Sequence, residues 1–129
     1  MKKRALLMGS FHKVQSLAAI LHDAGYMVTV IHSDVAEGDA LTAAGASSAT
    51  LAVAMSAADA DNLIACQLCK RMFHVPRTIS LVQDAQKTAL FYKLGIDSVV
   101  CEISSLKRVV EQQEFLGGLA PIVPISDGR

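Results

Sequence analysis

The chain has 129 residues, a length that fits a single domain, and 52% of them are hydrophobic, which is ample for one packed core. Its 12 basic and 12 acidic residues balance. Composition therefore gives no reason to expect nucleic-acid binding, which depends on clustered Lys and Arg.

No apolar run reaches the roughly 18 to 20 residues that a membrane span needs. The apolar run after the basic start ends at Gly9, too early for a signal peptide. We therefore expect a cytoplasmic protein with no direct membrane insertion. The three cysteines are few and odd in number, which favours reduced thiols over a disulfide framework.

Short apolar runs alternate with helical patterns through the first half of the chain. Residues 5–8 predict a buried strand, and apolar residues at helical spacing over 14–21 predict the helix after it. Gly25 suits the left-handed position that follows a helix. The β-branched run 26–31 predicts a second buried strand, and residues 37–45 predict a short helix or turn.

The middle of the chain repeats this alternation. Residues 49–55 predict a third strand. Ser56 and Asp59, three residues apart, form a capping-box pattern for a helix that runs to about Phe73. Helical spacing predicts that the inward face of this helix carries Ile64, Ala65, Leu68, Cys69 and Met72.

The last elements follow the same order. Residues 78–82 predict a fourth strand, and Asp84 can cap a helix that Gly95 stops. Residues 98–101 predict a fifth strand. A final amphipathic helix carries Leu106, Val109 and Val110.

Continuous apolar strands alternating with amphipathic helices predict an α/β fold. We expect a Rossmann-like three-layer α/β/α arrangement with a mostly parallel sheet of about five strands. The domain should span residues 1–116, and residues 117–129 should form a C-terminal tail or linker.

Ligands of open α/β sheets bind at the carboxyl ends of the strands. On that edge, backbone N–H groups at Gly9 and Ser10 can hold a phosphate, and His12 can add positive charge. After the second strand, His32 lies at the same edge, and Asp34 can hold a ribose hydroxyl.

The dinucleotide fingerprint of this turn is degraded. Only its first glycine, Gly9, is in place. Phe11 stands where the second glycine lets the backbone approach a pyrophosphate, and Val14 stands where the third allows close helix packing. We include Phe11 among the candidate cofactor-binding residues because it occupies this position.

Two segments together resemble a known family. Residues 62–71, followed by 75–77, are similar to one helix and the next strand of the TrkA N-terminal domain family. Residues 89–100 are similar to its next helix, leucine-glycine stop and final strand. These are the RCK (regulator of potassium conductance) domains of potassium channels and of Trk or Ktr transporters, and the likeness spans about residues 3–112.

The resemblance implies a ligand and partners. Family members bind NAD(H), ADP, ATP or AMP and pass the signal to a membrane potassium channel or transporter. It also implies a homodimer or higher homo-oligomer. Asn62 falls where the family's loop meets the nucleotide, so it either donates to a ribose or phosphate oxygen or only helps to start its helix.

One departure concerns the sheet. The family has another helix and edge strand before its Gly-Asp pair, but here Gly38-Asp39 follows Ile31 almost at once. We therefore expect one α–β unit to be missing, which leaves the strand order 2-1-3-4-5. The degraded glycine motif and the missing α–β unit both put nucleotide binding in question. They affect docking to a membrane partner less.

Other chemistry finds little support in the sequence. Cys66 and Cys69 have the spacing of redox or metal sites, but mid-helix they favour plain packing, and we predict no metal site. Cys101 has no adjacent base in sequence. His12 and His32 either bind phosphate or are simply exposed.

The sequence leaves three functions open. The first is a regulatory domain for potassium transport with weak or lost nucleotide binding. The second is a small NAD(P)-dependent oxidoreductase, although no catalytic set is identifiable and we predict no enzyme activity. The third is an interaction module without a ligand. The nucleotide, if one binds, is NAD(H) or ATP, ADP or AMP.

Overall fold

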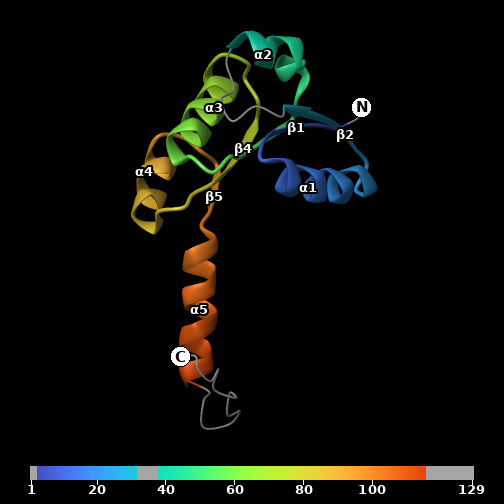
Figure 1. Cartoon of the computed structure of the whole chain (residues 1–129). Helices are drawn as coiled ribbons and strands as arrows, with labels where there is room; N and C mark the ends of the chain where they lie inside the picture. The colour runs from blue at the N-terminus through green and yellow to red at the C-terminus, as the bar shows by residue number, and fades with distance from the viewer. Residues whose placement is uncertain (1–2, 32–37, 116–129) are drawn as a thin grey trace.

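Five parallel strands form one sheet with helices on both faces (Figure 1). The computed structural model describes residues 3–31 and 38–115. The strand order is β2-β1-β3-β4-β5, and each neighbouring pair is parallel. The predicted order and strand number are therefore confirmed. The strands are β1 (Lys3–Gly9), β2 (Tyr26–Ile31), β3 (Leu51–Met55), β4 (Arg77–Leu81) and β5 (Ser98–Val100).

The helices divide between the two faces according to strand order. The chain moves outward from β1 to β2 in one direction and from β3 to β5 in the other, so right-handed crossovers place their helices on opposite faces. Figure 1 shows α1 on one side and α2, α3 and α4 on the other, with α5 projecting away from the body. The bounds are α1 (Phe11–Asp23), α2 (Gly38–Ala43), α3 (Asp59–Arg71), α4 (Thr88–Lys93) and α5 (Glu102–Phe115), with short 3₁₀ turns η1 (Ala46–Ser48) and η2 (Ala85–Lys87).

The central strands are buried on both faces. Every residue of β3 is buried, and so are residues 5–9 of β1. Helices on both sides exclude water from these two strands, which explains why their sequences are continuous apolar runs rather than alternating ones. One core cluster lies between the sheet and α2, α3 and α4, and a second lies between the sheet and α1.

The predicted capping box at the start of α3 was wrong. The N-cap of α3 is Ala58, and it makes no side-chain capping bond. Asp59 instead reaches the loop after β4, where its carboxylate accepts from the backbone N–H groups of Gln83 (2.7 Å) and Asp84 (3.1 Å). Two backbone donors outside the helix thus hold the side chain that the pattern assigned to the helix terminus.

The predicted inward face of α3 was also partly wrong. Its buried residues include Asn62 and Cys66 beside Ala65 and Cys69, whereas Ile64 and Met72 are exposed. Asn62 hydrogen-bonds the ends of β3 and β4, and the Cys66 thiol donates to the Ile79 carbonyl at 3.5 Å. These polar contacts rotate the helix away from the orientation that apolar spacing alone predicts. The helix also ends at Arg71 rather than at Phe73.

Gly9 lies where β1 passes closest to β3. It pairs with Met55 across the two strands and has a φ of +142°. A Cβ built on Gly9 would lie 2.5 Å from the Met55 carbonyl carbon and 2.8 Å from the Ser56 nitrogen. Since these are backbone atoms, no rotamer change could relieve the overlap, and only glycine fits this position.

We predict that Gly9→Ala destabilises the fold by about 2–4 kcal/mol, because it combines strained backbone with a backbone overlap. The measurement is denaturant unfolding followed by circular dichroism. Gly45→Ala is the matched control: Gly45 also has positive φ, at +76°, but a Cβ there meets nothing within 4 Å. The control should lose only about 1 kcal/mol. Equal losses in the two variants would contradict this account of the close approach.

Candidate functional site

The carboxyl ends of β1, β3 and β4 form one rim of the sheet, which includes the switch in strand order between β1 and β3. β1 ends at Gly9 and α1 begins at Phe11, so Ser10 alone joins them. Ser10 has extended backbone (φ −70°, ψ 146°), and its side chain makes no capping hydrogen bond. The first backbone bond of α1 runs from the Val14 N–H to the Ser10 carbonyl at 3.1 Å. The N-terminus of α1 therefore lies at the rim, in the place where α/β domains hold anions.

Acidic side chains lie at the starts of α2, α3, η2 and α5, but not at the starts of α1, η1 and α4. The first turn of α1 has no acidic residue. The first turns of the other helices contain Asp39 in α2, Asp59 and Asp61 in α3, and Glu102 in α5, and Asp84 is the N-cap of η2. Because like charges repel a phosphate, the N-terminus of α1 suits an anion better than those of α2, α3 and α5 do.

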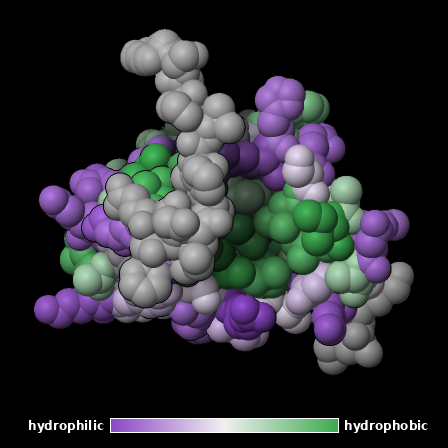
Figure 2. Space-filling view, turned by 90° about the horizontal axis from the view of Figure 1, so that it is seen from below, coloured by the Kyte–Doolittle hydropathy of each residue, from purple (hydrophilic) through white to green (hydrophobic). Residues whose placement is uncertain are grey.

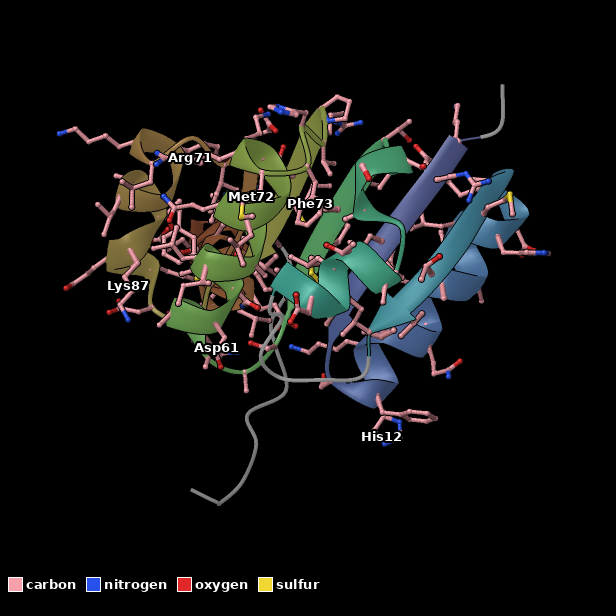
Figure 3. The ribbon with its side chains drawn as sticks, turned by 90° about the horizontal axis from the view of Figure 1, so that it is seen from above. His12, Asp61, Arg71, Met72, Phe73 and Lys87 are labelled. Carbon is pink, nitrogen blue, oxygen red and sulfur yellow. The ribbon has the colours of Figure 1, made fainter. Side chains whose placement is uncertain are left out.

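Two basic side chains lie in the first turn of α1. His12 is exposed at the N-terminal end of α1, and Figure 3 shows it apart from Asp61 at the start of α3. The Phe11 ring stands edge-on to the His12 ring, with centroids 5.7 Å apart. Lys13 pairs with Glu102 at 2.8 Å. Glu102 therefore offsets part of the positive charge that an anion would meet.

Asn62 is buried and fully engaged by the backbone. Its side-chain oxygen accepts from the Ser56 N–H at 2.8 Å, and its amide donates to the carbonyls of Ser56 and Leu81, each at 3.0 Å. Both amide hydrogens are thus used inside the protein. The side chain joins the end of β3 to the end of β4, and a ligand contact from this amide stays a prediction.

The other candidate residues lie in two groups. Gly9, Ser10, Phe11 and His12 come together at the turn into α1. His32 and Asp34 lie outside the described residues, so their proposed ribose and phosphate roles stay predictions. The sequence analysis missed the part that Asp59 plays in fixing the rim. Its partners are 24 and 25 residues away, and no local pattern signals such a contact.

Cys66 and Cys69 are packed in the core as free thiols. Burial, together with the neighbouring Cys69, raises the pKa of Cys66 to about 12, and burial raises that of Cys69 to about 11. No group of three or more His, Cys, Asp or Glu side chains in the described part of the chain could hold a metal ion. The surroundings of Cys66 and Cys69 suit packing rather than redox chemistry, which requires a thiolate.

A parallel sheet with a glycine turn leading into a helix N-terminus defines a Rossmann-type α/β domain. Within that class, this chain belongs to the TrkA-N domain family, whose sequence model matches residues 12–102. The match begins at His12, after the degraded glycine turn. Across the described residues, no helix has the length and apolarity needed to cross a membrane.

Solved structures agree on the fold. The chain of a structure described as the GsuK channel bound to NAD is 17% identical, with a TM-score of 0.79, over 92% of this chain and 24% of that one. A Kef C-terminal domain from Shewanella denitrificans in its AMP-bound form is 22% identical, with a TM-score of 0.71, over 89% and 82%. The TrkA-N domain of the Escherichia coli inner membrane protein YbaL is 13% identical, with a TM-score of 0.65, over 87% and 96%. This chain spans about a quarter of the GsuK channel chain, and no curated protein sequence matches it.

We predict that Asn62→Leu destabilises the protein by about 2–4 kcal/mol, because it leaves buried backbone groups of Ser56 and Leu81 without partners. Thermal and denaturant unfolding measure the loss. Gln67→Leu is the control: it makes the same chemical change at a partly exposed position of the same helix, and it should alter stability by less than about 0.5 kcal/mol. A loss under about 1 kcal/mol in Asn62→Leu would contradict the structural role of this amide.

We predict that Cys66 and Cys69 stay unmodified when the native protein meets iodoacetamide at pH 8. At that pH almost none of either thiol is ionised, because their pKa values are about 12 and about 11. Mass spectrometry of digested protein measures labelling at each site. The control is the same reaction in denaturant, where both should label readily. Rapid native labelling, or a disulfide between the two, would show that the pair is accessible.

Proposed function

We propose that this chain is a regulatory domain of a potassium channel or transporter, acting at the cytoplasmic side of the membrane. The observation that carries the proposal is the N-terminus of α1, which is free of acidic residues within a TrkA-N fold. In this proposal it binds the phosphate of an adenine nucleotide. Ligand-bound structures of the same fold, with NAD or with AMP, support this class of ligand.

A mononucleotide suits this rim better than a dinucleotide. Phe11 places a side chain where a second glycine would admit a pyrophosphate. Among the residues that the structure describes, the sheet also ends at β2, without the additional edge strand that the family usually has beyond it. AMP or ADP needs less of the binding surface that such an edge strand would add than NAD(H) does. We therefore propose an adenine mononucleotide bound with modest affinity.

Regulation requires that the ligand favour one of two conformations. A ligand shifts such an equilibrium only by its difference in affinity for the two states. We propose that the domain is a homodimer and that nucleotide binding at α1 changes how the dimer engages its membrane partner. The proposal assigns no catalytic role to Cys66 and Cys69, because burial keeps both thiols protonated.

We predict that AMP and ADP bind more tightly than NADH, and that His12→Glu weakens AMP binding at least about fivefold, since a carboxylate beside a phosphate repels it. Isothermal titration calorimetry measures both affinities, and thermal shift supports them. The control is His22→Glu, the same substitution on an exposed residue in the last turn of the same helix. It should leave the affinity for AMP within about twofold.

Three results would redirect the proposal. Tight NADH binding with turnover of a substrate would favour an oxidoreductase. A flat response to AMP, ADP, ATP and NADH would favour an interaction module without a ligand. Equal weakening by His12→Glu and His22→Glu would place the nucleotide away from the N-terminus of α1.

A further inference from the structure

Strand β2 forms one edge of the sheet. It pairs with β1, and within the described residues no strand pairs with its other side (Figure 1). Its six residues, Tyr26–Ile31, include no charged residue and no proline. Edge strands usually carry such residues because these discourage pairing with another chain. β2 therefore lacks the features that keep an edge strand unpaired, and it presents an edge to which a further strand can add.

The backbone of β2 bonds β1 through every second residue. The Thr50 N–H donates to the Arg4 carbonyl at 2.8 Å, so Arg4 directs its backbone groups toward β3. Ala5, the next residue, therefore directs its own groups toward β2, where it lies opposite Val28. In a parallel pair such a residue bonds the residues before and after its opposite, so the two neighbours of Val28 bond β1. The N–H and C=O groups that face the open side are those of Tyr26, Val28 and Val30.

A hollow of about 440 Å³ follows this open edge. Four consecutive residues of β2, 26–29, line it, and their side chains alternate between the two faces of the sheet. A hollow in contact with both faces of an edge strand lies along its outer side. Arg4 also lines it, and so does His22, which lies 3.6 Å from Asp23. The hollow thus differs in character from the broad apolar area that Figure 2 shows on the face seen from below.

Positive charge lies beside the start of β2. Lys3 and Arg4 lie opposite Tyr26 and Met27 in the neighbouring strand. The Lys3 ammonium lies 5.5 Å from the centre of the Tyr26 ring. In the part of the chain that the structure describes, neither Lys3 nor Arg4 makes an ion pair. Arg4 shares a face of the sheet with Met27, which is 42% exposed. The charge of Arg4 is therefore open to a group that approaches β2 from outside.

We propose that β2 binds an extended segment of another protein as an additional strand, and that an acidic side chain of this segment pairs with Arg4. Main-chain hydrogen bonds to the open edge supply affinity, and side chains beside the strand supply specificity. A second copy of β2 has no acidic residue to offer, so it fits this edge less well than an acidic segment does. The inference goes beyond the proposed function and does not depend on nucleotide binding at α1, which lies at the other end of β1 from Arg4.

The first test is amide hydrogen exchange of the full chain, followed by NMR of the ¹⁵N-labelled protein. Without a ligand, the amides of Val28 and Val30 should exchange at least about tenfold faster than those of Met27 and Thr29, because only the latter two bond β1. Slow exchange at Val28 and Val30 would overturn the proposal, since it would show that residues 32–37 or a second copy already cover the edge. A rise of that protection with protein concentration would identify the second copy.

The second test adds the probe peptide acetyl-Glu-Val-Thr-Val-Thr-Val-Glu-amide. Its Val side chains suit the covered face of β2, which carries Val28 and Val30, and its Thr and Glu side chains suit the open face with Met27 and Arg4. A Glu at each end can meet Arg4 in either strand direction. At about 1 mM peptide, amide shifts should centre on β2, and exchange at Val28 and Val30 should slow. The same peptide with Lys in place of both Glu residues should bind at least about fivefold more weakly.

Matched variants separate the charge of Arg4 from the charge of the whole protein. Arg4→Glu should weaken binding of the probe peptide at least about fivefold. Arg108→Glu, the same substitution on an exposed residue of α5, should leave it within about twofold. Methylation of two adjacent central nitrogens of the peptide removes a donor from each of its edges and should abolish binding. Circular dichroism melts verify that both variants are folded.

Three results would contradict strand addition at β2. They are the absence of shifts on β2 at about 2 mM peptide, equal binding of the methylated peptide, and equal affinity of Arg4→Glu and wild type for the probe. The peptide is titrated without nucleotide, so a failure of nucleotide binding is seen separately by calorimetry.

Discussion

The close approach of β1 to β3 at Gly9 is the constraint on which the carboxyl rim of the sheet depends. No side chain fits between Gly9 and the backbone of Met55 and Ser56. This contact fixes where β3 ends relative to the start of α1. From Ser56 the connection continues through Asn62 to the end of β4. Gly9, the first glycine of the fingerprint, therefore has a packing role in this chain.

At the rest of the rim, side chains of α3 already bind the backbone groups that follow β3 and β4. The Asp59 carboxylate accepts from the backbone N–H groups of Gln83 and Asp84 after β4. The Asn62 side-chain oxygen accepts from the Ser56 N–H after β3. Donors that a phosphate could have used there are occupied by the protein itself. The N-terminus of α1 differs because no acidic residue lies in its first turn. The ligand proposal therefore depends on the first turn of α1, whose positive charge Glu102 only partly offsets, rather than on a glycine motif.

Sequence reasoning succeeded where a local signal determines the structure and failed where distant contacts do. Continuous apolar runs predicted the buried strands, and the short link before Gly38 predicted a five-stranded sheet. Gly25 and Gly95 marked helix ends at positive φ, as expected. The orientation of α3 was missed because polar contacts of Asn62 and Asp59 to other elements outweigh its apolar spacing. Nothing local in the final helix signals that its apolar stripe points away from its own sheet.

The central proposal is that the N-terminus of α1 binds a phosphate although the glycine motif before it is degraded. The most direct measurement is a titration of the ¹⁵N-labelled protein with AMP, followed by amide chemical shifts. The account predicts that the largest changes fall on the amides of Ser10, His12 and Lys13. Shifts centred on Gln83 and Asp84, or none at millimolar AMP, would contradict it.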